Sequence, residues 1–403
     1  MKKYIFIVCV SSLLVSCVKT HIKNDITKKI DSTSLMIEDC TTDYAVINTE
    51  LLEGIEIDKY NEKIKSIKYI GLVSEEPIGT FYQLMIFNDK IYILDTNIEK
   101  IFIFNTDGKI IHIIDDKGGG PKEYTGLGTM CISMKDSCLI VSDRLSMHIL
   151  YYSLDGNFIK KEKGIASCFI ESYGNKIINQ LDFGQSFSTD INSNFHLVFS
   201  IKDSILKKAF PLYPIQINAV VEKSLSYNSK GGLLCSPLYS DTVYQIINDS
   251  IYTPKYVFQQ NKSLWSKNQE PLSVKEKALL IINDKYTCLG KPFLETYNFI
   301  SYRIKLFGGN VHYVGSVNYY YDKTKKKSFY FNALLDSKNL PNYIPSAETI
   351  YNNYFVGYIS PSIIENIREW GKTHELNIEN EELRNLINSN DDFEGIIVMY
   401  ELK

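Results

Sequence analysis

Residues 90–111 read KIYILDTNIEKIFIFNTDGKII, and residues 138–159 repeat the pattern 48 positions later as CLIVSDRLSMHILYYSLDGNFI. Each copy holds two short apolar runs, rich in Ile, Leu and aromatic residues, and then an Asp-Gly pair. Such runs, closed by turn-forming residues, are typical of β-strands joined in hairpins. A period of about 40 to 50 residues with several strands per unit is typical of β-propeller blades. The repeat therefore predicts an all-β propeller.

The apolar runs are nearly continuous, which suits strands that are buried on both faces. In a propeller, the neighbouring blades supply that burial. Four further blades are expected from residues 175–180 with 195–201, 233–247 with 252–259, 297–306 with 311–321 and 328–334, and 354–359 with 396–402. Residues 55–72 are expected to complete the last blade, so that the two ends of the chain close the ring. The prediction is a six-bladed β-propeller with short helical insertions near the C-terminus.

The motifs IYILD, IFIFNTDGKII and GGGPKEY (residues 118–124) resemble those of six-bladed β-propeller lipoproteins that are abundant in Bacteroides-type bacteria. Those proteins are distant relatives of NHL-repeat proteins. Residues 236–246, 254–256 and 395–400 are also similar to that family, and the resemblance covers residues 50–403. It implies a propeller in the cell envelope. It implies no particular activity, because the family as a whole has no assigned biochemical role.

Residues 1–16 have the features of a lipoprotein signal peptide. Lys2 and Lys3 precede a mostly apolar stretch at residues 4–15, which is too short to span a bilayer comfortably. Residues 14–17, Leu-Val-Ser-Cys, match a bacterial lipobox. Cys17 is therefore predicted to be acylated and to become the mature N-terminus. An ordinary secretion signal with an incidental cysteine is the alternative.

Two regions follow the predicted signal peptide. Residues 17–50 are predicted to form the lipidated N-terminus and a polar tether, and residues 51–403 are predicted to form the propeller. Val18 stands where an aspartate would retain a lipoprotein at the inner membrane, which favours the outer membrane. Residues 19–23 lack the acidic cluster that resembles a surface-export signal, which favours the periplasmic face over surface display. The net charge of −3 gives no support for a nucleic-acid partner.

The cysteines leave two alternatives open. Cys131 and Cys138 flank a predicted turn, and a hairpin centred there would place them opposite one another. A disulfide is one reading, because the cell envelope permits such bonds. Buried thiols are the other, because most of the cysteines stand in apolar runs. No cysteine or histidine spacing matches a zinc site.

Three helical insertions are expected. Ser273 with Glu276, and Ser362 with Glu365, form capping boxes, and a third helix is expected over residues 381–388. Packing of the apolar helix faces on the propeller is one reading. Docking of a partner protein through Trp370 is the other.

Candidate binding residues come from loops, because no His-Glu-x-x-His or Gly-x-Ser-x-Gly motif is present. Asp143 and Arg144 follow a strand, and Tyr239 and Asp241 precede one, so these four are the candidates for ligand binding at the axial mouth. A turn-capping carboxylate is the alternative for Asp143, as it is for Asp95 at the corresponding position of the repeat. For Arg144, Tyr239 and Asp241, the alternative is a solvated polar or charged side chain in a loop.

The leading functional interpretation is a non-enzymatic envelope lipoprotein that binds or scaffolds a glycan, a peptide or another envelope protein. It would contact the membrane through the lipid on Cys17. The alternative is a metal-dependent hydrolase, lactonase or lyase with a divalent cation held in the central channel by side chains from several blades. No other cofactor is expected, and the sequence assigns no metal ligands.

Overall fold

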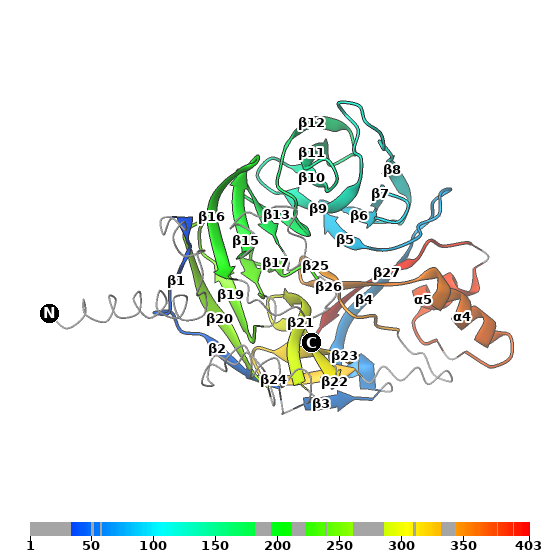
Figure 1. Ribbon diagram of the computed structural model, residues 1–403. Helices are drawn as coiled ribbons and strands as arrows, with labels where there is room; N and C mark the ends of the chain where they lie inside the picture. Colours follow the sequence, from blue (N-terminus) through cyan, green and yellow to red (C-terminus); the bar gives the residue numbers. More distant parts are fainter. Residues whose placement is uncertain are drawn as a thin grey trace.

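The computed structural model describes residues 34–49, 52–56, 59–181, 195–211, 222–237, 240–260, 286–308, 312–331, 343–376, 378–389 and 391–403. These residues form six sheets that surround a common axis (Figure 1). The fold is a six-bladed β-propeller, as the repeat predicts.

In every blade, the first strand in sequence of the repeating unit lies at the axis and the others follow outward. Blade 1 contains β5 (Gln83–Phe87), β6 (Lys90–Asp95), β7 (Lys100–Asn105) and β8 (Ile110–Ile114). Blade 2 contains β9 (Leu127–Ser133), β10 (Cys138–Asp143), β11 (His148–Ser153) and β12 (Phe158–Lys163). Blade 3 contains β13 (Phe169–Tyr173), β14 (Lys176–Gln180), β15 (Phe195–Ile201) and β16 (Ser204–Pro211).

The remaining blades use the expected segments. Blade 4 contains β17 (Leu225–Tyr227), β18 (Leu233–Cys235), β19 (Thr242–Ile246) and β20 (Ile251–Gln259). Blade 5 contains β21 (Tyr286–Glu295), β22 (Phe299–Gly308), β23 (His312–Asp322) and β24 (Lys327–Phe331). Blade 6 contains β25 (Thr349–Tyr351), β26 (Tyr354–Ile359), β27 (Ile396–Leu402) and, at its outer edge, β4 (Ile64–Gly71).

The two ends of the chain close the ring, as predicted. The N-terminal strand β4 pairs antiparallel with the C-terminal strand β27, and Ile70 stands opposite Ile397. Because this pairing joins the first and last parts of the propeller, it holds the ring shut and covers an edge of β27 that would otherwise be open.

The propeller begins before the expected residue 51. Strands β1 (Ile37–Glu38) and β2 (Ala45–Asn48) pair in parallel with β20 and widen blade 4. Strand β3 (Leu52–Ile55) likewise pairs with β24 of blade 5. The backbone groups of these outer strands find partners on the blade edges. Residues 37–48 are therefore part of the fold, although the sequence analysis assigns them to the tether.

The core lies between the blades, and β6 shows why its sequence is continuously apolar. Tyr92 and Leu94 pack into the cluster between blades 1 and 2, whereas Ile91 and Ile93 pack into the cluster between blades 6 and 1. All four are fully buried. Successive side chains of a strand point to opposite faces, so burial on both faces requires an unbroken apolar run.

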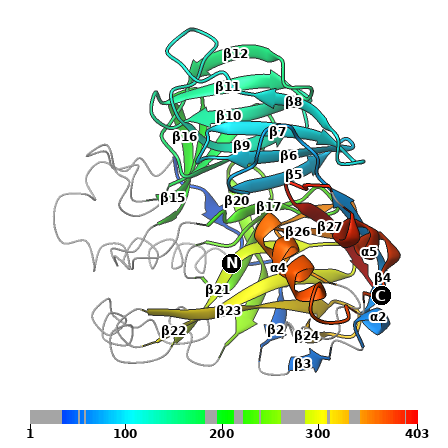
Figure 2. The same ribbon diagram turned by 90° about the vertical axis from the view of Figure 1, so that its right-hand side faces the viewer.

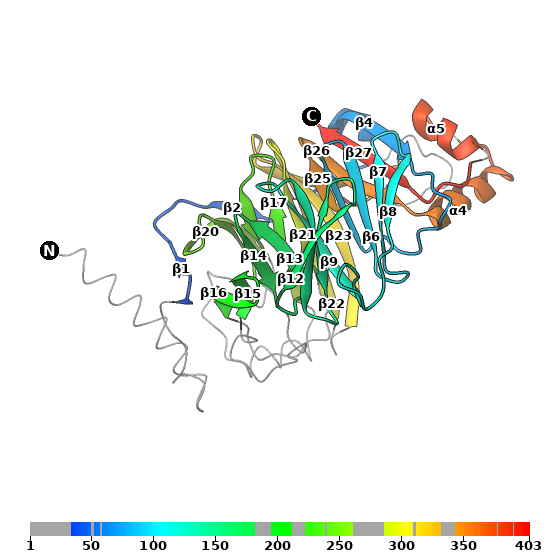
Figure 3. The ribbon, with the colours of Figure 1, turned by 90° about the horizontal axis from the view of Figure 1, so that it is seen from above.

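The described helices are α2 (Tyr60–Lys63), α4 (Pro361–Gly371) and α5 (Glu381–Asn388). Helices α4 and α5 lie at the outer edge of the ring beside β4 (Figures 2 and 3), where Ile364, Leu383 and Ile387 join the core cluster of blades 5 and 6. The predicted packing of these helices on the propeller is confirmed.

The predicted helix caps are only partly correct. Asn380 caps α5 with its side chain, which accepts a hydrogen bond from the Leu383 N–H. Helix α4 begins two residues earlier than expected, with Ser360 as N-cap and Pro361 at its first position, where proline is favoured because it has no N–H to satisfy. The prediction of Ser362 as the cap is therefore wrong. Ser273 and Glu276 lie outside the described residues.

Cys131, Cys138 and Cys235 are buried thiols that form no disulfide. In the β9–β10 hairpin, Cys131 stands opposite Ile140 and Cys138 stands opposite Ser133, so the two cysteines are not aligned for a bridge. The reading of buried thiols is therefore confirmed for these three. No helix of the described residues is long and apolar enough to cross a membrane.

Candidate functional site

The structure gives Asp143 a turn-capping role in place of the expected ligand contact. Its carboxylate accepts hydrogen bonds from the backbone N–H and hydroxyl of Thr125, at 2.7 and 3.0 Å, and from those of Ser146, at 3.2 and 2.6 Å. The N–H groups of Gly126 and Leu145 also donate to it. Asp143 is 1% exposed. These contacts tie the turn after β10 to the segment that enters β9.

Asp95 has the same role in blade 1. Its carboxylate accepts hydrogen bonds from the N–H groups of Gly79 and Thr80, at 2.7 and 2.8 Å, and from those of Asn97 and Ile98. In both repeats, a buried carboxylate therefore joins the turn after the second strand of the blade to the segment that enters the first strand.

Two other predicted residues, Arg144 and Asp241, do not line the cavity that occupies the axis of the propeller. Arg144 is exposed, and Asp241 is buried and accepts a hydrogen bond from Gln260 at 3.0 Å. Tyr239 and Cys17 lie outside the described residues.

Trp370 lies half-buried on α4. Its ring stacks on His374 with the ring centroids 3.7 Å apart, and its buried Nε1 has no hydrogen-bond partner among the described residues. Docking of a partner protein through Trp370 stays a prediction.

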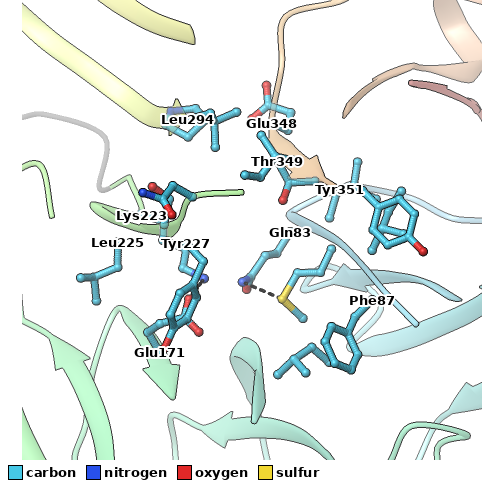
Figure 4. A pocket seen from close by; sticks show the side chains of 18 of the residues that line it. Gln83, Phe87, Glu171, Lys223, Leu225, Tyr227, Leu294, Glu348, Thr349 and Tyr351 are labelled. Atoms are coloured by element: carbon cyan, nitrogen blue, oxygen red, sulfur yellow. Dashed lines mark hydrogen bonds and ion pairs between the residues drawn. The ribbon is translucent and has the colours of Figure 1, made fainter. Parts of the chain in front are cut away.

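A cavity of about 820 Å³ occupies the axis of the propeller, and strands of several blades line it. In Figure 4, Leu225 and Tyr227 of β17 lie on one side of this cavity and Tyr351 of β25 lies on the other, with Gln83 of β5 between them. Phe87 and Leu294 complete an apolar wall. This volume falls within the range of about 300 to 1,000 Å³ that is usual for ligand pockets.

Paired charges line part of this cavity, and we call them, together with Lys305, the partner of Glu222 outside the lining, the charged rim: Glu171, Glu222, Lys223, Arg303, Lys305 and Glu348. Lys223 pairs with Glu171 at 2.7 Å, Lys305 with Glu222 at 2.6 Å and Arg303 with Glu348 at 2.6 Å. Each pair joins adjacent blades, from blade 3 to blade 6. Because each carboxylate of the charged rim is paired with a basic side chain, the rim can hydrogen-bond polar groups of a ligand, and the ligand need not carry a strong charge.

Hairpin turns also line the cavity, among them those that contain Ser229 and Asn352. Ser229, in the turn after β17, donates its backbone N–H to the Glu295 carbonyl at 3.0 Å and its hydroxyl to the Asn352 carbonyl at 2.6 Å. One turn of blade 4 therefore contacts both blade 5 and blade 6. These contacts hold the turns of three blades together.

The carboxylate of Glu295 anchors the same region. It accepts hydrogen bonds from Lys255 at 2.7 Å, Tyr256 at 2.6 Å and Asn228 at 3.0 Å, and Lys323 pairs with it at 3.1 Å. Burial opposes its ionisation, but the hydrogen bonds from Lys255 and Tyr256 outweigh burial and lower the pKa of Glu295. The carboxylate is therefore held ionised as part of the framework.

The chain matches the family model described as "Domain of unknown function (DUF4934)" over residues 45–401. The chain belongs to this family. Membership of the DUF4934 family and the six-bladed fold agree with the coarser part of the resemblance noted in the sequence. The relation to NHL-repeat proteins and the lipid anchor stay predictions.

Two solved structures illustrate the likeness in fold. A "Putative exported protein" from Bacteroides fragilis NCTC 9343 is 14% identical, with 90% of this chain and 100% of that chain covered and a TM-score of 0.64. A member of the DUF4221 family from Bacteroides vulgatus is 11% identical, with 84% and 97% covered and a TM-score of 0.44. At 14% identity, the likeness to the Bacteroides fragilis protein supports the fold alone. No curated protein matches the chain.

Sequence analysis missed the residues that line the cavity. Gln83 and Glu171 are polar residues inside apolar strands, and both are less than 10% exposed. A buried polar residue in a strand is a usable signal, because it must find a partner. The sequence does not say which partner, since the partners of these two residues stand on other blades.

Proposed function

We propose that this DUF4934 protein is a lipid-anchored binding protein of the cell envelope, at the outer membrane, and that its ligand occupies the central cavity. The observation that carries the proposal is the cavity itself, which combines an apolar wall with a charged rim. Pockets of small-molecule and peptide ligands have this composition. The lipobox ending at Cys17 supports the location.

The paired carboxylates favour binding over metal-dependent catalysis. Glu171, Glu222 and Glu348 line the cavity, and each is paired with a basic side chain. Among the residues that the structure describes, no three His, Cys, Asp or Glu side chains gather closely enough to hold a metal ion. The described part of the chain therefore offers no specific support for a hydrolase, lactonase or lyase.

Replacing Thr349 by tryptophan is expected to weaken ligand binding by about 100-fold or more, because a half-buried side chain that faces the cavity would become an indole that fills it. Binding of the full-length protein in detergent to glycan and peptide arrays measures the effect. Ile159→Trp is the matched control, since Ile159 is 53% exposed on the outer strand β12. Equal binding by both variants and the wild type would refute the cavity as the site.

Replacing Cys17 by alanine is expected to move the protein from the membrane fraction to the soluble fraction, because acyl chains supply the membrane affinity of a lipoprotein. Immunoblots of fractionated cells measure the distribution. Cys40→Ala is the control, since Cys40 is an exposed cysteine that the lipobox does not include. Retention of the Cys17 variant in the membrane fraction would contradict lipid anchoring.

A further inference from the structure

We propose that the ligand is a peptide in extended conformation, which adds as a strand to the inner edge of β5. This inference rests on the proposed function and names the chemical class of its ligand. The inner edges of the six blades are comparable, because each inner strand pairs with a neighbour on one side only and turns its other edge toward the axis.

Side chains occupy the inner edges of β9 and β13. The Gln83 amide accepts a hydrogen bond from the Met130 N–H at 3.0 Å and donates one to the Met130 carbonyl at 2.6 Å, as a neighbouring strand would. The hydroxyl of Tyr227 donates to the Ser172 carbonyl on β13, and the Ser172 N–H donates to Glu171 at 3.2 Å.

The segment that leads into β17 is covered in the same way. The Gln180 amide accepts a hydrogen bond from the Ser224 N–H and donates one to the Glu222 carbonyl, both at 2.8 Å. Two glutamines, Gln83 and Gln180, therefore cover backbone groups of the following blade.

The edge of β21 is also occupied, and side chains contact the residues that flank β25. On β21, three alternate carbonyls accept hydrogen bonds: Lys291 from Arg303 at 3.1 Å, Phe293 from Ser226 at 2.6 Å, and Glu295 from Ser229 at 3.0 Å. At the two ends of β25, the Ala347 carbonyl accepts from Arg303 and the Asn352 carbonyl accepts from Ser229.

Strands β17 and β25 have three residues each, and among the described residues no neighbouring blade pairs with their own inner edges. Strand β5 is longer, with five residues, and its inner edge is also free. Asn88 and Asp89 have φ values of 49° and 57°, so they form the two-residue turn that makes Phe87 and Lys90 a hydrogen-bonded pair. Because bonding alternates along an antiparallel pair, the backbone groups of Leu84 and Ile86 point away from β6. No other described residue hydrogen-bonds to the backbone of either one.

The cavity gives access to this edge. All residues from 81 to 88 line it, so both faces of β5 and the edge between them border the same space. Unpaired N–H and C=O groups on a strand edge are a template for another extended chain. A peptide backbone offers donors and acceptors at the repeat of a β-ladder, whereas a glycan does not.

The walls indicate which peptide fits. Five residues of β5 span roughly 17 Å at about 3.4 Å per residue, which sets the paired segment at about five residues. Side chains of an added strand alternate in direction, and Ile132 and Leu225 meet one set while Thr349 and Tyr351 meet the other. We therefore expect apolar side chains at alternate positions of the ligand.

The first test separates this inference from the proposed function. Phage-displayed random peptides of about seven residues are selected on the full-length wild-type protein and on the Thr349→Trp variant. Enrichment on the wild type alone supports a peptide in the cavity. Equal enrichment on both proteins would refute the cavity as the binding site. If glycans bind the wild type alone and no peptide is enriched, the proposed function stands and the peptide inference is overturned.

The second test reads the pairing directly. With the selected peptide bound, hydrogen exchange at the Leu84 and Ile86 amides is expected to slow by about tenfold or more, since both would gain acceptors. The Met130 amide is the internal control, because Gln83 already pairs with it. N-methylation at alternate peptide positions is expected to weaken binding by about tenfold, and at intervening positions by little. Unchanged exchange at both amides, or equal tolerance of methylation at every position, would overturn strand addition to β5.

Discussion

Replacing Ile70 by aspartate is expected to abolish cooperative folding of the propeller. Ile70 is 4% exposed in β4, stands opposite Ile397 and packs into the core between blades 6 and 1. An unpaired carboxylate at this position would lose its hydration without gaining a partner, which costs more than about 4 kcal/mol. Domains of this kind are stable by only about 5 to 15 kcal/mol. The site also lies in the seam that closes the ring.

Thermal unfolding followed by circular dichroism measures this effect. Lys68→Asp is the matched control, because Lys68 lies in the same strand but is exposed. The control is expected to change the free energy of unfolding by less than about 1 kcal/mol. An Ile70 variant that unfolds within a few degrees of the wild type would show that the seam contributes little to stability.

Replacing Asp143 by alanine is expected to lower the free energy of unfolding by about 3 kcal/mol. The substitution leaves the N–H groups of Thr125, Gly126 and Leu145 without their acceptor, and hydrogen bonds to a charged group are worth about 1.5 to 3 kcal/mol each. Chemical denaturation at neutral pH measures the loss. Asp107→Ala, at an exposed turn of blade 1, is the control and is expected to change stability by less than about 0.5 kcal/mol.

The Asp143 effect is expected to depend on pH. Burial opposes ionisation, but the hydrogen bonds from Ser146 and Thr125 outweigh it and hold the pKa of Asp143 below its usual value. A lowered pKa in the folded state means that this stabilisation is present above the unfolded pKa of about 3.9 and is lost as pH falls through the folded pKa. The difference between wild type and variant should therefore be constant near neutral pH and shrink in acid. A difference that grows in acid would contradict this account.

The repeat in the sequence identified blades 1 and 2 because both copies are regular. Later blades could still be found, since their strands keep long apolar runs such as residues 299–308 and 312–322. The short strands β1 and β2 were assigned to a tether, because four residues or fewer carry too little periodicity to be recognised. The cap of α4 was misplaced by two residues, since Pro361 sets the helix start without a side-chain hydrogen bond.

The candidate site could not be predicted in the same way. Asp143 was proposed as a ligand contact because it follows a strand. In the structure, both oxygens of its buried carboxylate accept hydrogen bonds from the turn that it caps and from the segment that enters β9. Gln83 and Arg303 do not belong to a recognisable local sequence motif. Their roles depend on backbone groups of other blades, 47 residues away for Gln83 and Met130 and 44 residues away for Arg303 and Ala347.

Sequence alone determined the fold class, the number of blades, the closure of the ring and the predicted lipid anchor, because apolar runs, turn residues and the lipobox are local patterns. Only the tertiary structure decided which residues surround the axis and which backbone edges there are already paired. The physical reason is that a blade is specified by contacts within about 50 residues of chain, whereas the channel is formed where the inner strands of different blades meet. The free edge of β5 is visible only when the contacts of the inner strands of all six blades are compared.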